Sequence, residues 1–300
     1  MKSPKNISAS VHARLLARAK KDQRPFNELL QYYAMERFLY RLSLSSHAQR
    51  FILKGALMLR VWNLPQHRPT MDIDMLGRTS NGETDVVAQI RDILTTDVDP
   101  DGLSFDAEAI QAERITEDAD YEGIRIHFLC FLGTARISMQ IDIGFGDIVY
   151  PEPEKKAFPV MLNSSAPRLL CYSLESSIAE KLEAMVKLGV LNSRMKDFYD
   201  IWTLSRQFDF RGTSLAEAIR LTFKRRGTAL PSAVEAFTEA FIDNKQKQWT
   251  AFHKRLQQEH VPASFKEIAA GLREFLTPII AAISTGIAIP KVWTAPGPWS

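Results

Sequence analysis

Hydrophobic and polar residues alternate in the middle of the chain, and this alternation predicts β-strands. Residues 136–144 alternate cleanly, with isoleucine and methionine on one face and polar side chains on the other. Residues 124–132 begin in the same way and then become apolar throughout. Gly133-Thr134-Ala135 can turn the first of these strands into the second.

Helical periodicity lies on both sides of the strands. Two helices are predicted near the start of the chain, one capped by Ser10 and ending near residue 22, the other running from Pro25 to about residue 42. Prolines at 151, 153 and 159 mark a break, beyond which the pattern is helical almost throughout. We therefore expect an α+β fold with two domains, residues 1–160 and a helical domain of residues 161–300.

Two aspartates lie where a loop runs into a predicted strand, in Arg68-Pro69-Thr70-Met71-Asp72-Ile73-Asp74. Residues two apart in a strand face the same side, so Asp72 and Asp74 share one face. Adjacent carboxylates repel each other unless a cation lies between them, and the cation that such carboxylates bind is usually Mg²⁺ or Mn²⁺. The alternative is a solvated edge strand. Asp142, near the end of the strand at 136–144, is the residue we predict as third metal ligand if the two strands are neighbours in register.

A glycine turn precedes these aspartates. Residues 51–53 are typical of a short buried strand, Lys54-Gly55 of a tight turn, and residues 56–62 of a helical segment. A strand, a glycine turn and a helix start present backbone N–H groups to an anion, so Gly55 is a candidate phosphate-binding residue. Lys54 and Arg68 could add positive charge to such a pocket, or could be surface residues.

Two charged residues interrupt the apolar stripes of helices predicted in the second half of the chain. Lys181 and Asp197 each occupy an inward position. Because a buried ammonium group is costly unless it is paired, we favour functional roles for both, facing the sheet that carries the aspartates. The alternatives are a lysine that reaches solvent and an aspartate near a helix N-terminus. Asp200 can pair on the surface with Lys196, four residues earlier.

Composition sets broad limits on the class of protein. The 300 residues are 45% hydrophobic and 24% charged, which is typical of a soluble globular protein, and the net charge of +3 is compatible with an anionic partner. Cys130 and Cys171 lie in apolar stretches, which indicates buried thiols in a reducing compartment. The start of the chain lacks the apolar run of a signal peptide, and the most apolar run, 279–289, is too short to span a membrane. We therefore expect a cytoplasmic protein with no membrane partner.

Basic residues gather on two predicted helices. They are either solvated faces or contacts to an RNA backbone, and for the second group a helix C-terminus that favours cations is a further explanation. The two groups are Arg14, Arg18, Lys20 and Lys21, and Lys224, Arg225 and Arg226.

Three of these segments together resemble a known family, the AbiEii/AbiGii-type nucleotidyltransferase toxins. Residues 51–56 with residues 68–74 are similar to its first motif, Glu180-Lys181-Leu182-Glu183-Ala184 to its lysine motif, and residues 194–201 to its R-x-x-D-x-x-D motif. The resemblance covers roughly residues 30–205. Two positions depart from the family pattern, since Ala56 stands where a second small, glycine-like residue is common and Thr70 stands where serine is common. Thr70 keeps the hydroxyl group needed for phosphate contact.

The resemblance implies a DNA polymerase β-like nucleotidyltransferase core, a small mixed sheet flanked by helices, with a helical C-terminal domain. It implies Mg²⁺ (or Mn²⁺), a nucleoside triphosphate substrate, transfer to RNA and in particular tRNA, and a cognate antitoxin as partner. In such a site Asp72, Asp74 and Asp142 would bind metal, and Gly55 and Thr70 would hold phosphates together with Lys54 and Arg68. Asp142 would also help to orient or deprotonate the attacking hydroxyl group. Lys181 would neutralise charge on the triphosphate, and Asp197 would orient Lys181 or complete the acceptor side. The alternatives are the same core acting on a small molecule or protein, and a non-catalytic binding module.

Overall fold

The computed structural model describes residues 6–64, 68–118 and 121–300 and divides the chain into two compact units. Unit 1 comprises Met1–Gly146 and Glu154–Cys171, and unit 2 comprises Asp147–Pro153 and Tyr172–Ser300. The boundary that we expected near residue 160 lies inside an antiparallel hairpin of unit 1, formed by β7 (Glu154–Ala157) and β8 (Arg168–Cys171).

Unit 1 is built on a mixed sheet that has eight strands among the described residues. The strand order is β3-β5-β6-β2-β1-β8-β7, and β4 pairs with β5 on the same side as β3. β2 is parallel to β6 and β1 is parallel to β8, and the other pairs are antiparallel. The remaining strands are β1 (Phe51–Lys54), β2 (Ile73–Gly77), β3 (Leu103–Phe105), β4 (Gln111–Asp118), β5 (Tyr121–Leu132) and β6 (Ala135–Phe145).

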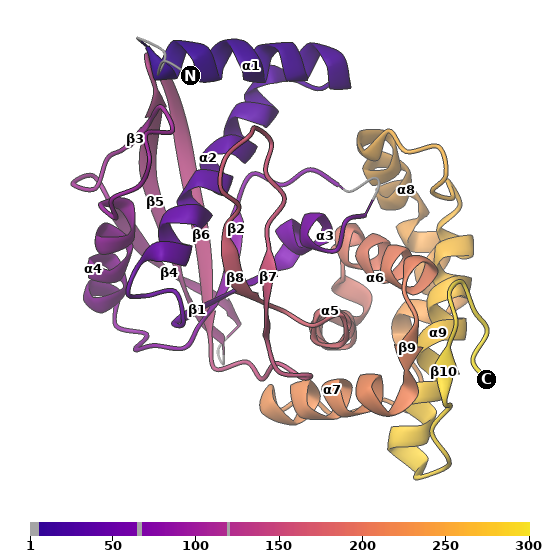
Figure 1. Ribbon diagram of the computed structural model, residues 1–300. Coiled ribbons are helices and arrows are strands. Elements are labelled where there is room, and N and C mark those ends of the chain that lie inside the picture. Colours follow the sequence, from indigo (N-terminus) through magenta and orange to yellow (C-terminus); the bar gives the residue numbers. More distant parts are fainter. Residues whose placement is uncertain (1–5, 65–67, 119–120) are drawn as a thin grey trace. The chain divides into compact units, whose positions relative to one another are not determined.

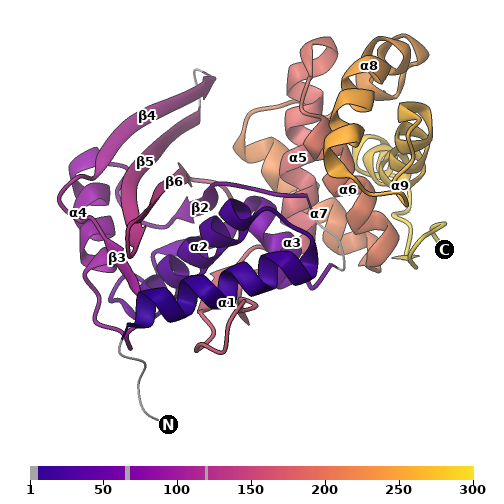
Figure 2. The ribbon, with the colours of Figure 1, turned by 90° about the horizontal axis from the view of Figure 1, so that it is seen from above.

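Helices cover the apolar face of this sheet. α2 crosses the face and contacts β6 and β8, α1 packs on α2, and α4 lies beside β4 (Figures 1 and 2). Alternation in β6 places Ile137, Met139 and Ile141 in this core, while Gln140 and Asp142 point to the opposite face. The helices of unit 1 are α1 (Ile7–Asp22), α2 (Phe26–Leu44), η1 (Gly55–Leu57), α3 (Met58–Val61) and α4 (Glu83–Leu94).

The strands predicted around residues 51, 124 and 136 are confirmed, as are the two N-terminal helices. The predicted N-cap Ser10 is wrong, because α1 begins one turn earlier and the Asn6 side chain accepts a hydrogen bond from the Ala9 N–H. The sheet of unit 1 with its flanking helices, followed by a helical unit 2, agrees with the expected fold class.

Unit 2 is mainly helical. Its aromatic core includes Phe198, Phe241 and Phe265, and its C-terminal segment packs Trp293 and Trp299 around Phe275. Its elements are α5 (Leu174–Leu188), η2 (Gly189–Leu191), α6 (Met195–Gln207), β9 (Phe210–Arg211), α7 (Gly212–Arg225), η3 (Glu235–Phe237), α8 (Glu239–Leu256), α9 (Phe265–Thr285) and β10 (Val292–Trp293).

One helix among the described residues, α9, is long and apolar enough to cross a membrane by length and composition alone. The expectation that no segment has this length was therefore wrong, because the apolar stripe of α9 begins well before residue 279. In unit 2, α9 packs against α6, α7 and α8 and buries Phe265, Leu272 and Phe275, as the central helix of a helical core does.

Candidate active site

Three carboxylates meet where β2 and β6 run side by side in unit 1. The parallel register places Asp74 directly opposite Asp142, and Asp72 immediately precedes β2. Oxygen atoms of Asp72, Asp74 and Asp142 lie within 4.8 Å of one another, and each residue is partly accessible. The structure thus brings together the three residues predicted as metal ligands. An all-oxygen, multiply charged donor set of this kind fits Mg²⁺ or Mn²⁺.

Gly55 lies against this cluster. Lys54, the last residue of β1, is opposite Asp74 in the antiparallel β1–β2 pair, so the turn that follows passes beside the Asp74 carboxylate. Gly55 has a φ of 69°, and a Cβ atom at this position would overlap the Asp74 side chain. Both the backbone conformation and the available space therefore require glycine.

The loop before β2 is fixed by buried polar groups of α2. The Thr70 N–H donates to the Tyr32 hydroxyl over 3.1 Å, and the Thr70 hydroxyl donates to the Asp72 carboxylate. Gln31 donates to the carbonyl oxygen of Met71 over 3.1 Å and to that of Ser138, in β6, over 3.0 Å. One helix thus ties the Asp72 loop to the strand that carries Asp142.

Arg68 is half-buried two residues before Thr70. The four residues predicted to contact phosphate lie on two segments beside Asp74. Lys54 and Gly55 are at the end of β1, and Arg68 and Thr70 are in the loop that precedes β2. Their assignment to phosphate contact stays a prediction.

Asp142 has a partner that the sequence reasoning missed. Arg125 in β5 donates from Nε to one carboxylate oxygen of Asp142 and from Nη2 to the other, each over 2.8 Å. These hydrogen bonds raise the pKa of Arg125 above its ordinary value, so it stays charged. Gln140 adds a third donor over 3.1 Å. This pairing could have been predicted from the sequence. The turn at Gly133-Thr134 sets the register of β5 and β6, and this register places Arg125 opposite Asp142.

In unit 2, Lys181 lies between two aspartates. Its Nζ is 3.1 Å from an oxygen of Asp197 and 2.9 Å from an oxygen of Asp200. The three side chains are 17%, 7% and 2% exposed, respectively. The predicted pairing of Asp200 with Lys196 on the surface is wrong, because Asp200 is buried and turned toward α5, whereas Lys196 is exposed. The predicted association of Lys181 with Asp197 is present.

Arg226 belongs to a second ionic network of unit 2. Its guanidinium lies 3.0 Å from Asp147, 2.9 Å from Glu183 and 3.5 Å from Glu180. Burial alone would lower the pKa of Arg226, but Glu180 and Asp147 raise it well above its ordinary value. Arg226 is thus a structural cation and not the RNA contact considered from the sequence, while Lys224 and Arg225 are exposed.

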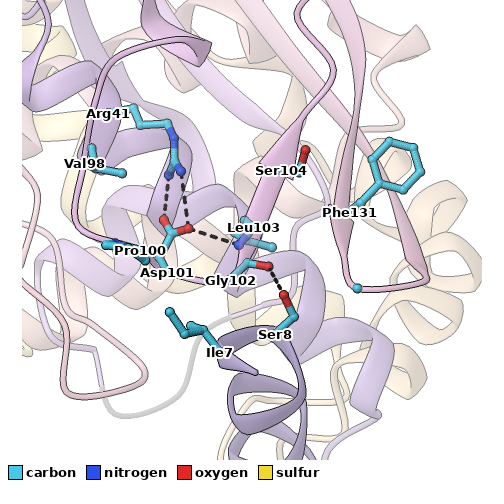
Figure 3. Close-up of a pocket in the computed structure, with 11 residues that line it drawn as sticks. Ile7, Ser8, Arg41, Val98, Pro100, Asp101, Gly102, Leu103, Ser104 and Phe131 are labelled. Carbon is cyan, nitrogen blue, oxygen red and sulfur yellow. Dashed lines mark hydrogen bonds and ion pairs between the residues drawn. The ribbon is translucent and has the colours of Figure 1, made fainter. Parts of the chain in front are cut away.

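A cavity of about 510 Å³ in unit 1 lies near the start of α1 and the β3–β5 edge (Figure 3). Asp101 on its wall accepts hydrogen bonds from Arg37 and Arg41 (Figure 3 draws those of Arg41). Burial alone would raise the pKa of Asp101, but the hydrogen bonds from Arg41 lower it. None of the predicted site residues lines this cavity, and the Asp101 hydrogen bonds join the segment before β3 to α2.

The mixed sheet, the aspartates at the start of β2, the third aspartate on the parallel strand β6 and the glycine turn together form the arrangement expected from the resemblance to nucleotidyltransferases. The model of the family described as "Nucleotidyl transferase AbiEii toxin, Type IV TA system" matches residues 37–271. The chain therefore belongs to the AbiEii family and is a nucleotidyltransferase toxin of a toxin–antitoxin system. Membership implies a nucleotide substrate and an antitoxin partner. No curated protein matches the chain closely enough to count as a relative.

Two solved structures from Helicobacter pylori match the chain. One, described as a candidate nucleotidyltransferase, has 14% sequence identity and a TM-score of 0.50, and the match covers 87% of this chain and 97% of that one. A second, JHP933, has 12% identity and a TM-score of 0.45, with 86% and 94% of the chains covered. At this level of identity the first similarity supports the fold, in agreement with the predicted core.

Proposed function

We propose that this toxin transfers a nucleoside monophosphate from a nucleoside triphosphate to RNA, and to tRNA in particular, with a divalent metal ion held by Asp72, Asp74 and Asp142. The observation that carries the proposal is the convergence of these three carboxylates within 4.8 Å beside a turn where only glycine fits. When bound, Mg²⁺ or Mn²⁺ would polarise the α-phosphorus of the triphosphate.

The remaining residues of unit 1 would then bind and orient the substrates. Gly55 and Thr70 would hold the β- and γ-phosphates, with Lys54 and Arg68 adding positive charge. Asp142 would accept a hydrogen bond from the attacking hydroxyl group and so orient it. Gln31 and Tyr32 would keep the loop that precedes β2 in place through their hydrogen bonds to Met71 and Thr70.

In unit 2, Lys181 is proposed to neutralise charge that develops on the triphosphate, as similarity to the family implies. Asp197 and Asp200 hold the ammonium group of Lys181 from two sides, so they orient it before substrate binds. Asp200 thus joins the residues proposed for this site.

An RNA acceptor is supported by the basic surface of α1. Arg14, Lys20 and Lys21 are exposed on this helix, and Arg18 is paired with Asp22. Lysine and arginine side chains that meet phosphates release counterions, so binding to RNA should weaken as salt rises. Binding that is unchanged between low and moderate salt would favour a small molecule or protein as acceptor. A cytoplasmic location is part of the same proposal.

The direct test is incubation with each α-labelled nucleoside triphosphate, Mg²⁺ and total cellular RNA, followed by separation of the labelled products. Label should enter tRNA with the wild type and be lost with Asp72→Asn or Asp74→Asn. Both variants should melt without metal at or above the wild-type temperature, because each removes repulsion within the cluster. Asp99→Asn, at an exposed loop position, is the matched control and should transfer normally. Label in protein or in a small molecule would refute the RNA acceptor, and transfer by both cluster variants would refute the metal site.

A further inference from the structure

Four charged side chains form one row across four adjacent strands of unit 1. The strand registers place Asp74 in β2 opposite Asp142 in β6, Asp142 opposite Arg125 in β5, and Arg125 opposite Glu113 in β4. Directly opposite residues on one face of a sheet are close enough to interact. Arg125 therefore lies between two carboxylates, one belonging to the candidate metal site and one outside it.

The contacts of Arg125 with these two acids are unequal. Both oxygens of Asp142 accept hydrogen bonds from Arg125 at 2.8 Å, whereas Nη1 is 3.6 Å from the nearer oxygen of Glu113. The Arg125 side chain is 33% exposed and that of Glu113 is 58% exposed. A long side chain with this freedom can shift toward Glu113 by changing rotamers, with no movement of the backbone.

The paired state conflicts with metal binding in two ways. A guanidinium fork that donates to both oxygens of Asp142 competes for the lone pairs that a cation needs. Its positive charge also repels a divalent cation at the cluster. In the metal-free state the same charge offsets the repulsion among Asp72, Asp74 and Asp142.

We propose that Arg125 is a positioning residue that moves between Asp142 and Glu113, holding Asp142 while the site has no metal and pairing with Glu113 when metal binds. This inference rests on the proposed metal site. It assigns Glu113 a role in metal affinity although Glu113 is two strands away from Asp142 and about 9–10 Å from it by strand spacing. His127, 3.7 Å from the same oxygen of Glu113, is the neighbour with which Arg125 would share that acid.

The test is Mn²⁺ binding, followed by electron paramagnetic resonance of free Mn²⁺, in variants that retain the wild-type circular dichroism spectrum. Arg125→Gln should bind Mn²⁺ roughly tenfold or more tightly, since it frees both Asp142 oxygens and removes a nearby positive charge. Glu113→Gln should bind it several-fold more weakly, because Arg125 then has no alternative partner. The double variant should match Arg125→Gln alone, since Glu113 acts only through Arg125.

Two controls separate this role from general electrostatics. Arg136→Gln removes an exposed arginine from the same face of β6 and should leave Mn²⁺ affinity within about twofold of the wild type, because screened charges at this distance act weakly. If Arg125→Gln does not fold, Arg125→Lys carries the test. A lysine lacks the fork and should also tighten binding, by a smaller factor.

The outcomes distinguish this inference from the proposed function. If Asp72→Asn does not weaken Mn²⁺ binding to the protein, the proposed metal site is wrong and this inference falls with it. If Asp72→Asn abolishes binding but Arg125→Gln binds equally or more weakly than the wild type, the metal site stands and the inference is overturned. A Glu113→Gln effect that persists in the double variant would also overturn it, since Glu113 would then act without Arg125.

Discussion

Replacing Lys181 by methionine should destabilise the protein, because it would remove the cation that two buried carboxylates share. The apolar stripe alone would suggest a small cost, since methionine matches the lysine stem, whereas a lysine that pairs with buried aspartates predicts a large one. The structure supports the second case. Lys181 lies within 3.1 Å of both Asp197 and Asp200, and those side chains are only 7% and 2% exposed. Removing one partner of a buried ion pair costs about 3–5 kcal/mol, which corresponds to a lower Tm by on the order of 10 °C.

Thermal melts of Lys181→Met and of three further variants test this magnitude. Lys196→Met makes the same substitution at an exposed position of α6 and should change the free energy of unfolding by less than about 0.5 kcal/mol. The triple variant Lys181→Met, Asp197→Leu, Asp200→Leu replaces the whole ionic group by apolar side chains and should recover most of the stability lost. Replacing Lys181 and Asp197 alone should not suffice, because Asp200 would still be buried and charged.

The transfer assay then distinguishes a structural role of Lys181 from a direct role in nucleotide transfer. A triple variant that folds well and transfers no nucleotide would support a direct role of Lys181 at the triphosphate. A triple variant that still transfers would show that Lys181 is a structural cation only. If Lys181→Met and Lys196→Met have the same melting temperature, the ion pairs of Lys181 contribute little to stability, and the predicted cost of about 3–5 kcal/mol is refuted.

Three further predictions concern unit 1. Gly55→Ala should abolish transfer because its methyl group displaces a cluster carboxylate, whereas Gly286→Ala, at a similar φ of 72° with no atom within 4 Å of the added Cβ, should cost about 1 kcal/mol of stability and no activity. Tyr32→Phe and Tyr33→Phe each remove one buried hydroxyl group that is hydrogen-bonded to the backbone. Only Tyr32→Phe should impair transfer, measured as kcat and KM, because only the Tyr32 hydroxyl holds the loop that carries Thr70. Burial raises the pKa of Glu36 to about 7, so wild-type stability should fall as the pH rises from the unfolded value of about 4.3 to about 7. Glu36→Gln should remove that loss. In urea unfolding, its free energy of unfolding should exceed that of the wild type by roughly 3 kcal/mol at about pH 8 and by much less at about pH 5. An equal difference at both pH values would contradict the raised pKa of Glu36.

The parts of the fold predicted from sequence are those that depend on local pattern. Period-two alternation locates β5 and β6, and a short apolar run followed by glycine locates β1 and its turn. The N-cap of α1 was missed because Ser10 and Asn6 are both good caps, and only the position of the first packed turn decides between them.

The candidate metal cluster was predictable because its members lie on strands whose faces follow from counting residues. Asp72 and Asp74 share a face by their spacing, and Asp142 falls on the polar face of a strand that alternates without interruption. Their meeting required one further fact, the parallel pairing of β2 with β6, which brings together segments about 70 residues apart in the chain and leaves no mark in either segment alone.

The partners of these charges were harder to predict because they depend on tertiary packing. Lys196 precedes Asp200 by one helical turn, and on an isolated helix the two would pair. In the folded chain α5 packs against α6, and the ammonium group of Lys181, which also pairs with Asp197, compensates the burial of Asp200. A local rule therefore gave the wrong partner at a site where two helices contribute charges to one buried group. The same reasoning applies to Arg226. Its place at the end of α7 fits the helix dipole, but its side chain pairs with two acids of α5, Glu180 and Glu183, and with Asp147, which lies between β6 and β7.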